Sequence, residues 1–238
     1  MNKRSWIIVS GALVIVLVVF GYTFLKSYMG NNIEISSVMP AQAAEADPNG
    51  GTSEAGADSG AAVSAEALNG EWTISEGSKV YYSVTTSQET VNFVNEKVNG
   101  SWTVDLDNPE AMKGSGKIDM TANDSGNSMR DEHIRGAEFF DAAAYPEAEF
   151  TAKSFDNLTS GWKEGAALPF TLTGTLKVRG IEKEVSIDAK VMYSGGKLLL
   201  SGTTVVTFSD FGMKNPHTVV LDTENDIKVQ LELILTKN

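Results

Sequence analysis

The chain of 238 residues contains no cysteine and only two histidines. Without cysteine it cannot form a disulfide scaffold, a thiol nucleophile, an iron–sulfur cluster or a cysteine-based zinc site, and two histidines exclude a multi-histidine metal site. The 31 acidic residues outnumber the 19 basic ones, and the net charge of −12 disfavours contact with nucleic-acid phosphates. We therefore expect no metal, no cofactor and no nucleic-acid partner.

A run without charged residues begins the chain, from Trp6 to Leu25, after two positive charges within residues 1–5. Twenty residues of helix rise about 30 Å, the thickness of the hydrocarbon core of a bilayer. A cleaved signal peptide is the alternative, but its apolar region is usually about 7–15 residues long. We expect a retained signal-anchor over 6–25, with residues 1–5 in the cytoplasm and the remainder outside. If the segment is cleaved, the protein is secreted.

Residues 26–70 are rich in alanine, glycine, serine and acidic side chains. Such a composition cannot bury enough apolar surface to order itself, which predicts a disordered linker. About forty flexible residues have a root-mean-square span of roughly 35 Å, so the folded part would stay near the membrane. The remaining 71–238 are long enough for one compact core.

Apolar and polar residues alternate through most of this region, with a period of two that indicates β-strands. The clearest runs cover 168–178, 185–193 and 227–235, and Gly and Asn-Pro turns separate the strands. Apolar stripes on so many strands predict an antiparallel sandwich or a closed barrel. Residues 128–143 do not alternate and predict a short helical insertion, with Ser128 as N-cap and Gly136 dividing it.

Three motifs carry a family resemblance. The first is RDEHIR at 130–135, followed by FFD at 139–141 and YP at 145–146; the second is GTLKVRGI at 174–181; the third is DFG at 210–212. In this order they resemble the YceI-like family. The resemblance implies an all-β, lipocalin-like antiparallel β-barrel of about eight strands over 71–238. Members of that family are described as polyisoprenoid-binding or associated with amphiphilic ligands, and most are secreted or periplasmic.

The helical insertion and the inward faces of the strands supply candidate ligand contacts. They are Asp131, His133, Arg135, Phe139, Phe140, Tyr145, Phe150, Leu172, Leu176, Val191 and Phe211. The polar three could meet a head group, Arg135 by its forked donors, or could instead pin the insertion to the barrel. The aromatic residues could line a pocket or complete the core. For Phe211 we expect a plug at one barrel end, with Gly212 allowing a bend.

We expect a non-enzymatic, extracytoplasmic protein that holds or shuttles a polyisoprenoid, an isoprenoid quinone or another amphiphilic lipid. His133 has no nucleophile with a matched partner near it in sequence, which disfavours acid–base catalysis on a bound lipid. The alternative is an envelope interaction protein whose barrel is filled by its own side chains. The family resemblance also allows a homodimer.

Overall fold

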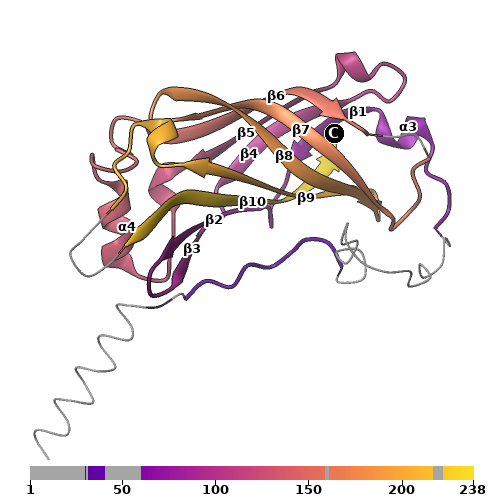
Figure 1. Cartoon of the computed structure of the whole chain (residues 1–238). Helices are drawn as coiled ribbons and strands as arrows, with labels where there is room; N and C mark the ends of the chain where they lie inside the picture. Colours follow the sequence, from indigo (N-terminus) through magenta and orange to yellow (C-terminus); the bar gives the residue numbers. More distant parts are fainter. Residues whose placement is uncertain (1–29, 31, 41–59, 159–160, 217–221) are drawn as a thin grey trace, which may run out of the picture.

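Ten antiparallel strands form one sheet, and eight of them close into a barrel (Figure 1). The computed structural model describes residues 30, 32–40, 60–158, 161–216 and 222–238. The strands are β1 (Gly70–Ile74), β2 (Lys79–Thr86), β3 (Thr90–Asn95), β4 (Val98–Val104), β5 (Lys113–Asp119), β6 (Glu147–Asp156), β7 (Ala167–Val178), β8 (Ile181–Ser194), β9 (Lys197–Thr207) and β10 (Thr223–Lys237). The all-β, lipocalin-like barrel expected from the sequence is confirmed.

Closure of the barrel depends on β10. One of its edges pairs with β9 from Asp226 to Thr236. Its other edge pairs with β2 along 223–232 and with β1 along 235–237. The hairpin of β2 and β3 therefore extends the sheet beside the barrel, while β1, β4 and β5 complete the ring.

Short helices and loops cover the two barrel ends. The α4 end carries α4 (Ser128–Arg135), η2 (Met120–Ala122), η3 (Ser209–Phe211) and the 178–181 turn. The opposite end, here the α3 end, carries α3 (Ala65–Leu68), η1 (Pro109–Ala111) and the 194–197 turn. Fully buried Leu68 and Trp72 close the α3 end, where the indole Nε1 of Trp72 donates to the Leu68 carbonyl at 2.8 Å.

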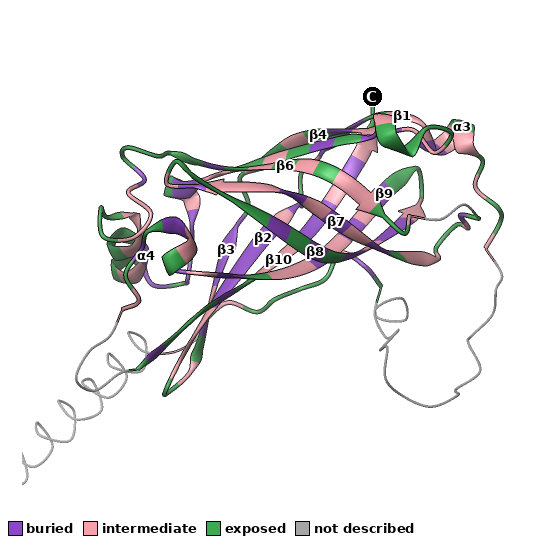
Figure 2. Ribbon diagram, turned by 45° about the horizontal axis from the view of Figure 1, so that its top comes forward, coloured by how far each residue is buried: buried purple, intermediate pink, exposed green. Residues whose placement is uncertain are grey.

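The alternation seen in the sequence corresponds to the inside and outside of the barrel (Figure 2). Along β7, Phe170, Leu172 and Val178 are buried, and the polar residues between them are more exposed. Along β8, buried Val185, Ile187 and the residues at 189 and 191 continue the same stripe. Burial of these stripes inside one closed sheet provides the core.

The helical insertion differs from its expectation at both ends. Asn127, not Ser128, is the N-cap, because its side-chain oxygen accepts from the backbone N–H groups of Met129 and Arg130 at 3.1 and 3.2 Å. The helix ends at Arg135 with Gly136 as C-cap, and turns follow to residue 144. The insertion is thus one two-turn helix followed by turns.

Two stretches within the predicted linker pack against the barrel. Residues 60–69 cover the α3 end, where α3 buries Leu68. Residues 32–40, which we call the strap, run in extended conformation along the outside of the sheet (Figure 1). The predicted signal-anchor over 6–25 lies outside the described residues. Within the described part of the chain, no helix is long and apolar enough to cross a membrane.

The strap explains an exception to the alternation. Tyr81 and Glu232 lie on the outward faces of β2 and β10, yet their exposed fractions are 1% and 0%. Ser36 contacts the Tyr81 hydroxyl, and Val38 donates to the Glu232 carboxylate. An outward carboxylate is therefore buried by a segment that is distant in sequence.

A substitution at Gly174 tests the packing between β6 and β7. A Cβ atom there would overlap the ring of Phe150 and the carbonyl oxygen of Thr151. We expect Gly174→Ala to lower the free energy of unfolding by about 1–3 kcal/mol, the usual cost of overpacking. Denaturant unfolding followed by tryptophan fluorescence measures this loss.

Gly116→Ala is the matched control, because a Cβ atom at this strand position meets only Ile74 at 3.7 Å and the Asn99 carbonyl oxygen at 3.9 Å. We expect no loss of stability for this variant. Equal losses at both glycines would contradict the packing argument.

Candidate ligand-binding cavity

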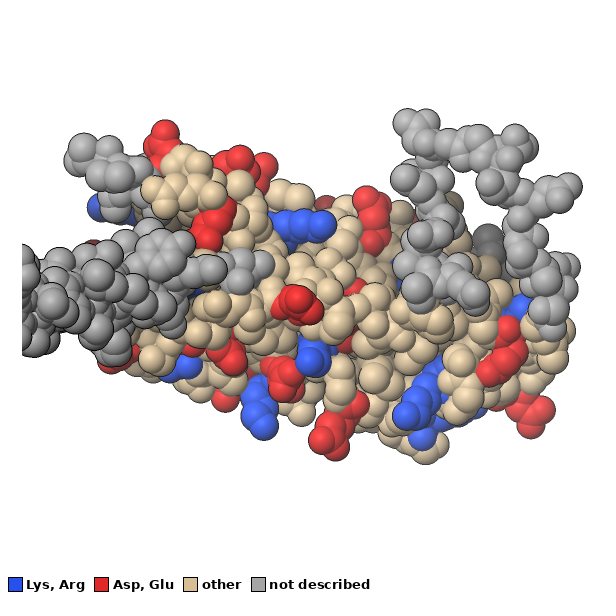
Figure 3. Space-filling view, turned by 90° about the horizontal axis from the view of Figure 1, so that it is seen from below, with Lys and Arg blue, Asp and Glu red and all other residues tan. Residues whose placement is uncertain are grey.

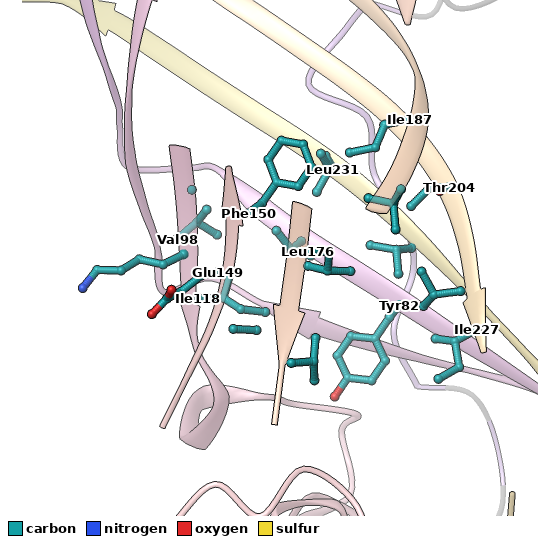
Figure 4. A pocket seen from close by; sticks show the side chains of 18 of the residues that line it. Tyr82, Val98, Ile118, Glu149, Phe150, Leu176, Ile187, Thr204, Ile227 and Leu231 are labelled. Atoms are coloured by element: carbon teal, nitrogen blue, oxygen red, sulfur yellow. The ribbon is translucent and has the colours of Figure 1, made fainter. Parts of the chain in front are cut away.

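The barrel encloses an apolar cavity of about 130 Å³ (Figure 4). Its lining comes from strands on all sides of the ring and includes Val98, Ile118, Phe150, Leu176, Ile187 and Leu231. In another protein, an engineered apolar cavity of about 150 Å³ stays dry and binds benzene. The space is therefore suited to a short apolar segment, and a longer chain requires movement of lining side chains.

Tyr82 brings a polar atom to this lining. Its ring stacks on Phe93 at a centroid distance of 4.7 Å and meets Phe140 edge-on at 5.7 Å. The hydroxyl group is buried and has no hydrogen-bond partner among the described residues. Burial raises the pKa of Tyr82 well above its usual value, the charge of Asp131 raises this pKa further, and Arg135 opposes the shift. The phenol therefore stays protonated and available as a donor.

Arg135 lies at the same end of the cavity, on the last turn of α4. One terminal nitrogen, Nη2, donates to the Asn123 carbonyl at 3.2 Å. Its Nε is buried and has no partner within the described part of the chain. Its charge acts on the pKa of Tyr82 in the direction opposite to that of Asp131. Tyr82 and Arg135 thus provide two unused donors at the α4 end.

The structure separates the eleven predicted contacts into two groups. Phe140, Phe150, Leu172, Leu176 and Phe211 line the cavity. Asp131, His133, Arg135, Phe139, Tyr145 and Val191 are outside its lining. Parity identified the inward strand residues correctly, whereas the helical insertion contributes only Phe140 directly.

Asp131 stabilises the loop before α4. Its Oδ1 accepts from the backbone N–H and the hydroxyl of Ser125, at 2.8 and 2.6 Å. Both residues are buried, with exposed fractions of 6% for Asp131 and 0% for Ser125. One carboxylate oxygen is thus bound to its own loop, and Asp131 does not reach the cavity lining.

The other residues outside the lining have local contacts. His133 is exposed and meets the Phe139 ring edge-on at 5.1 Å. Tyr145 is 39% exposed on the α4 end and packs over Gly180. Val191 is buried nearer the α3 end, paired with Leu168 and Leu200. The second histidine, at 217, lies outside the described residues.

The DFG motif closes the α4 end of the cavity. Phe211 is 1% exposed and reaches the lining, and Gly212 follows in left-handed conformation with φ of 65°. The plug and the bend expected here are therefore observed. Asp210 accepts from Lys183 at 2.6 Å, and this hydrogen bond holds the pKa of the Asp210 carboxyl below its usual value.

Tyr82 is the residue that the sequence reasoning missed. Its parity already placed it on the inward face with Val80 and Val84. A hydroxyl on an otherwise aliphatic inward face was the available signal. Within the described residues, no group of three or more acidic or histidine side chains is placed to hold a metal ion.

Comparison with known proteins identifies relatives of the barrel. The sequence profile described as the YceI-like domain matches residues 72–234. Protein YceI of Salmonella arizonae is 38% identical over 96 residues, which are 40% of this chain and 46% of that protein. This chain thus matches less than half the length of that curated relative.

Two solved structures share the fold. BcnA of Burkholderia cenocepacia aligns with a TM-score of 0.57 and 19% identity, over 66% of this chain and 95% of BcnA. A polyisoprenoid binding domain from Saccharophagus degradans, implicated in plant cell wall breakdown, aligns with a TM-score of 0.59 and 12% identity. That alignment covers 70% of this chain and 98% of the domain.

The role of Asp131 can be tested by stability. Asp131→Ala leaves the buried backbone N–H of Ser125 without an acceptor and its hydroxyl with only the Asn127 carbonyl, at 3.5 Å. We therefore expect a loss of about 1–3 kcal/mol in the free energy of unfolding. The exposed His133 serves as the control, and His133→Ala should change stability by less than about 1 kcal/mol. Thermal and denaturant unfolding measure both. A neutral Asp131→Ala would mean that the loop is held by other contacts.

Proposed function

Because this chain belongs to the YceI-like family, we propose that its barrel holds the apolar chain of an amphiphilic lipid, of the polyisoprenoid or isoprenoid-quinone class. The observation that carries the proposal is an apolar cavity with a buried hydroxyl at its end, that of Tyr82, which has no partner among the residues the structure describes. The described binding of the Saccharophagus degradans domain supports the same ligand class.

Binding of such a chain draws its free energy from burial. Each CH₂ group transferred from water contributes about 0.8 kcal/mol, so a few isoprene units bind without specific polar contacts. The present cavity of about 130 Å³ holds only part of such a chain. Phe140 and Phe150 line it and are only half-buried, so their rotation offers one way to lengthen it.

A head group with an oxygen acceptor would meet Tyr82 and Arg135. The neutral phenol donates one hydrogen bond, and Arg135 Nε donates a second without losing its contact with Asn123. A quinone carbonyl or a prenyl phosphate oxygen offers the matching acceptor. Both donor atoms are buried away from solvent, so the bond to the ligand costs little further desolvation.

We further propose that residues 6–25 anchor the chain in a membrane, with the barrel on the extracytoplasmic side. The uncharged run of 20 residues and the two positive charges before it support this topology. The anchor would keep the barrel beside its lipid source. The protein would act as a non-enzymatic carrier, with Tyr82 as a hydrogen-bond donor.

A second function is favoured by the size of the cavity. A barrel that its own side chains fill to within about 130 Å³ could serve as a rigid scaffold for an envelope partner. Organic extraction of the full-length protein, purified from a bacterial membrane in mild detergent, distinguishes the two functions. An isoprenoid or quinone in stoichiometric amount supports the carrier. If no such lipid is extracted and the protein takes up no added isoprenoid quinone, the scaffold function is supported instead.

Ala148→Leu provides a control for this experiment. Ala148 is buried and lines the cavity, so the larger side chain occupies ligand space. We expect extracted lipid to fall at least tenfold while the fold is retained. Lipid recovered equally from this variant would be bound elsewhere, for example at the anchor or in the detergent micelle.

Tyr82→Phe separates a ligand contact from a structural role. Loss of one hydrogen bond to the ligand should weaken affinity for an isoprenoid quinone about tenfold, or about 1.4 kcal/mol. Stability should be unchanged or higher, because the hydroxyl has no partner to lose among the described residues. Quinone titration followed by tryptophan fluorescence and denaturant unfolding give the two values. Unchanged affinity would remove Tyr82 from the site.

A further inference from the structure

The buried carboxylate of Glu232 joins the strap to the barrel wall. Its Oε2 accepts from the backbone N–H of Val38 at 2.8 Å and from the hydroxyl of Ser37 at 3.1 Å. Its Oε1 accepts from Ser201 at 2.8 Å and Gln230 at 2.7 Å. A buried carboxylate is costly unless it is fully hydrogen-bonded. Half of its donors come from the strap, so the strap has a defined seat.

Further contacts give the strap a register along the barrel. Asn92 donates to the Ile33 carbonyl at 2.9 Å, and the hydroxyls of Ser36 and Tyr81 lie 3.0 Å apart. Met39, at the far part of the strap, is buried with 4% exposed. The strap therefore runs from the β2–β3 hairpin along β10 toward the α3 end (Figure 1).

The start of this docked segment lies at the α4 end. The backbone N–H of Gly30 donates to Glu89 at 2.9 Å, and the Gly30 carbonyl accepts from Arg130 at 3.3 Å. Gly30 is five positions after Leu25, and an extended chain spans at most about 18 Å over five steps. A free linker over 26–69 would instead have a root-mean-square reach of about 35 Å.

From this geometry we propose that the strap holds the α4 end of the barrel against the membrane surface. The proposal rests on the anchor proposed above, because a membrane segment ending at Leu25 puts the surface within about 18 Å of Gly30. The end with the unused donors of Tyr82 and Arg135 then faces the lipid source. Buried side chains close both ends, Phe211 at the α4 end and Leu68 with Trp72 at the α3 end, and the α3 end faces away from the lipid source.

The surface of the α4 end fits a bilayer as its occupant. Five large apolar side chains are exposed among the described residues, and three of them are here: Met129, Tyr145 and Ile181, at 52%, 39% and 42%. Acidic and basic side chains are interspersed on the strap-bearing face (Figure 3). The orientation therefore depends on the strap and these apolar contacts, and zwitterionic lipid should suffice.

The absence of cysteine makes the orientation measurable with single labels. Glu138→Cys marks the α4 end and Glu110→Cys marks the α3 end, and both positions are exposed. The full-length protein, labelled with a donor fluorophore, is reconstituted into phosphatidylcholine vesicles that carry acceptor-labelled lipid. We expect energy transfer from position 138 to be at least twice as efficient as from position 110.

Replacement of 32–39 by glycine and serine at equal length tests the strap itself. We expect the difference between the two labels to disappear, because the barrel then rotates on a free linker. The matched control is the same replacement over 41–48, which leaves the strap intact and should keep the difference. Glu232→Gln, which removes the charge and keeps the size, should reduce the difference in part.

Each other outcome overturns the proposal. Equal energy transfer from both positions with the strap intact contradicts the proposed orientation. A difference between the positions that survives strap replacement means that another contact sets the orientation. Transfer between donor-labelled and acceptor-labelled copies at position 138, in sparsely loaded vesicles, would make the α4 end a face for a second copy. A chain that does not float with the vesicles refutes the anchor, while the lipid extraction still decides the carrier function.

Discussion

The pairing of β10 on both edges is the constraint on which the remaining structure depends. This 15-residue strand bonds to β9 on one side and to β1 and β2 on the other. Without the pairing of β1 with β10 the sheet would stay open, and its apolar stripes would face water. Closure removes the exposed edges of the eight barrel strands and encloses a dry interior.

The dry interior in turn determines the protonation state and the hydrogen-bonding opportunities of the few polar atoms in it. Tyr82 keeps its proton because burial disfavours the phenolate. Its hydroxyl and the Nε of Arg135 lack partners within the described residues, although most buried polar groups are paired. Such exceptions, one on the cavity lining and one beside it, are the features that a ligand with an oxygen acceptor would satisfy.

On the outer face of the barrel, the strap covers one outward-facing carboxylate, that of Glu232. Glu232 alternates correctly as an outward residue, yet the strap buries it and supplies half of its donors. The contacts of Gly30, Ile33, Ser36 and Val38 follow one direction along the barrel. A segment within the predicted linker thereby connects the orientation of the barrel to the start of the chain.

Much of this architecture could be predicted from the sequence because strand periodicity is local. The inward parity of 168–178 and 185–193 identified Leu172 and Leu176, and the three family motifs identified the barrel. The N-cap of α4 was wrong by one residue, because Asn127 and Ser128 are both good caps. The packing of 32–40 could not be predicted, because its contacts are with β2, β3 and β10, far away in the chain. Its apolar residues Ile33, Ile35, Val38 and Met39 nevertheless distinguish it from the rest of the predicted linker.

The sequence by itself therefore determined the closed β-barrel, its apolar interior and the position of the helical insertion. The strands, their inward faces and the insertion follow from alternation and turn residues within short windows, and the choice of a closed barrel over a sandwich follows from the family motifs. Only the tertiary structure decided which polar groups remain unpaired, how far side chains fill the interior, and which segment covers Glu232. Those properties depend on contacts between residues far apart in the chain, such as Val38 with Glu232, and no local pattern records them.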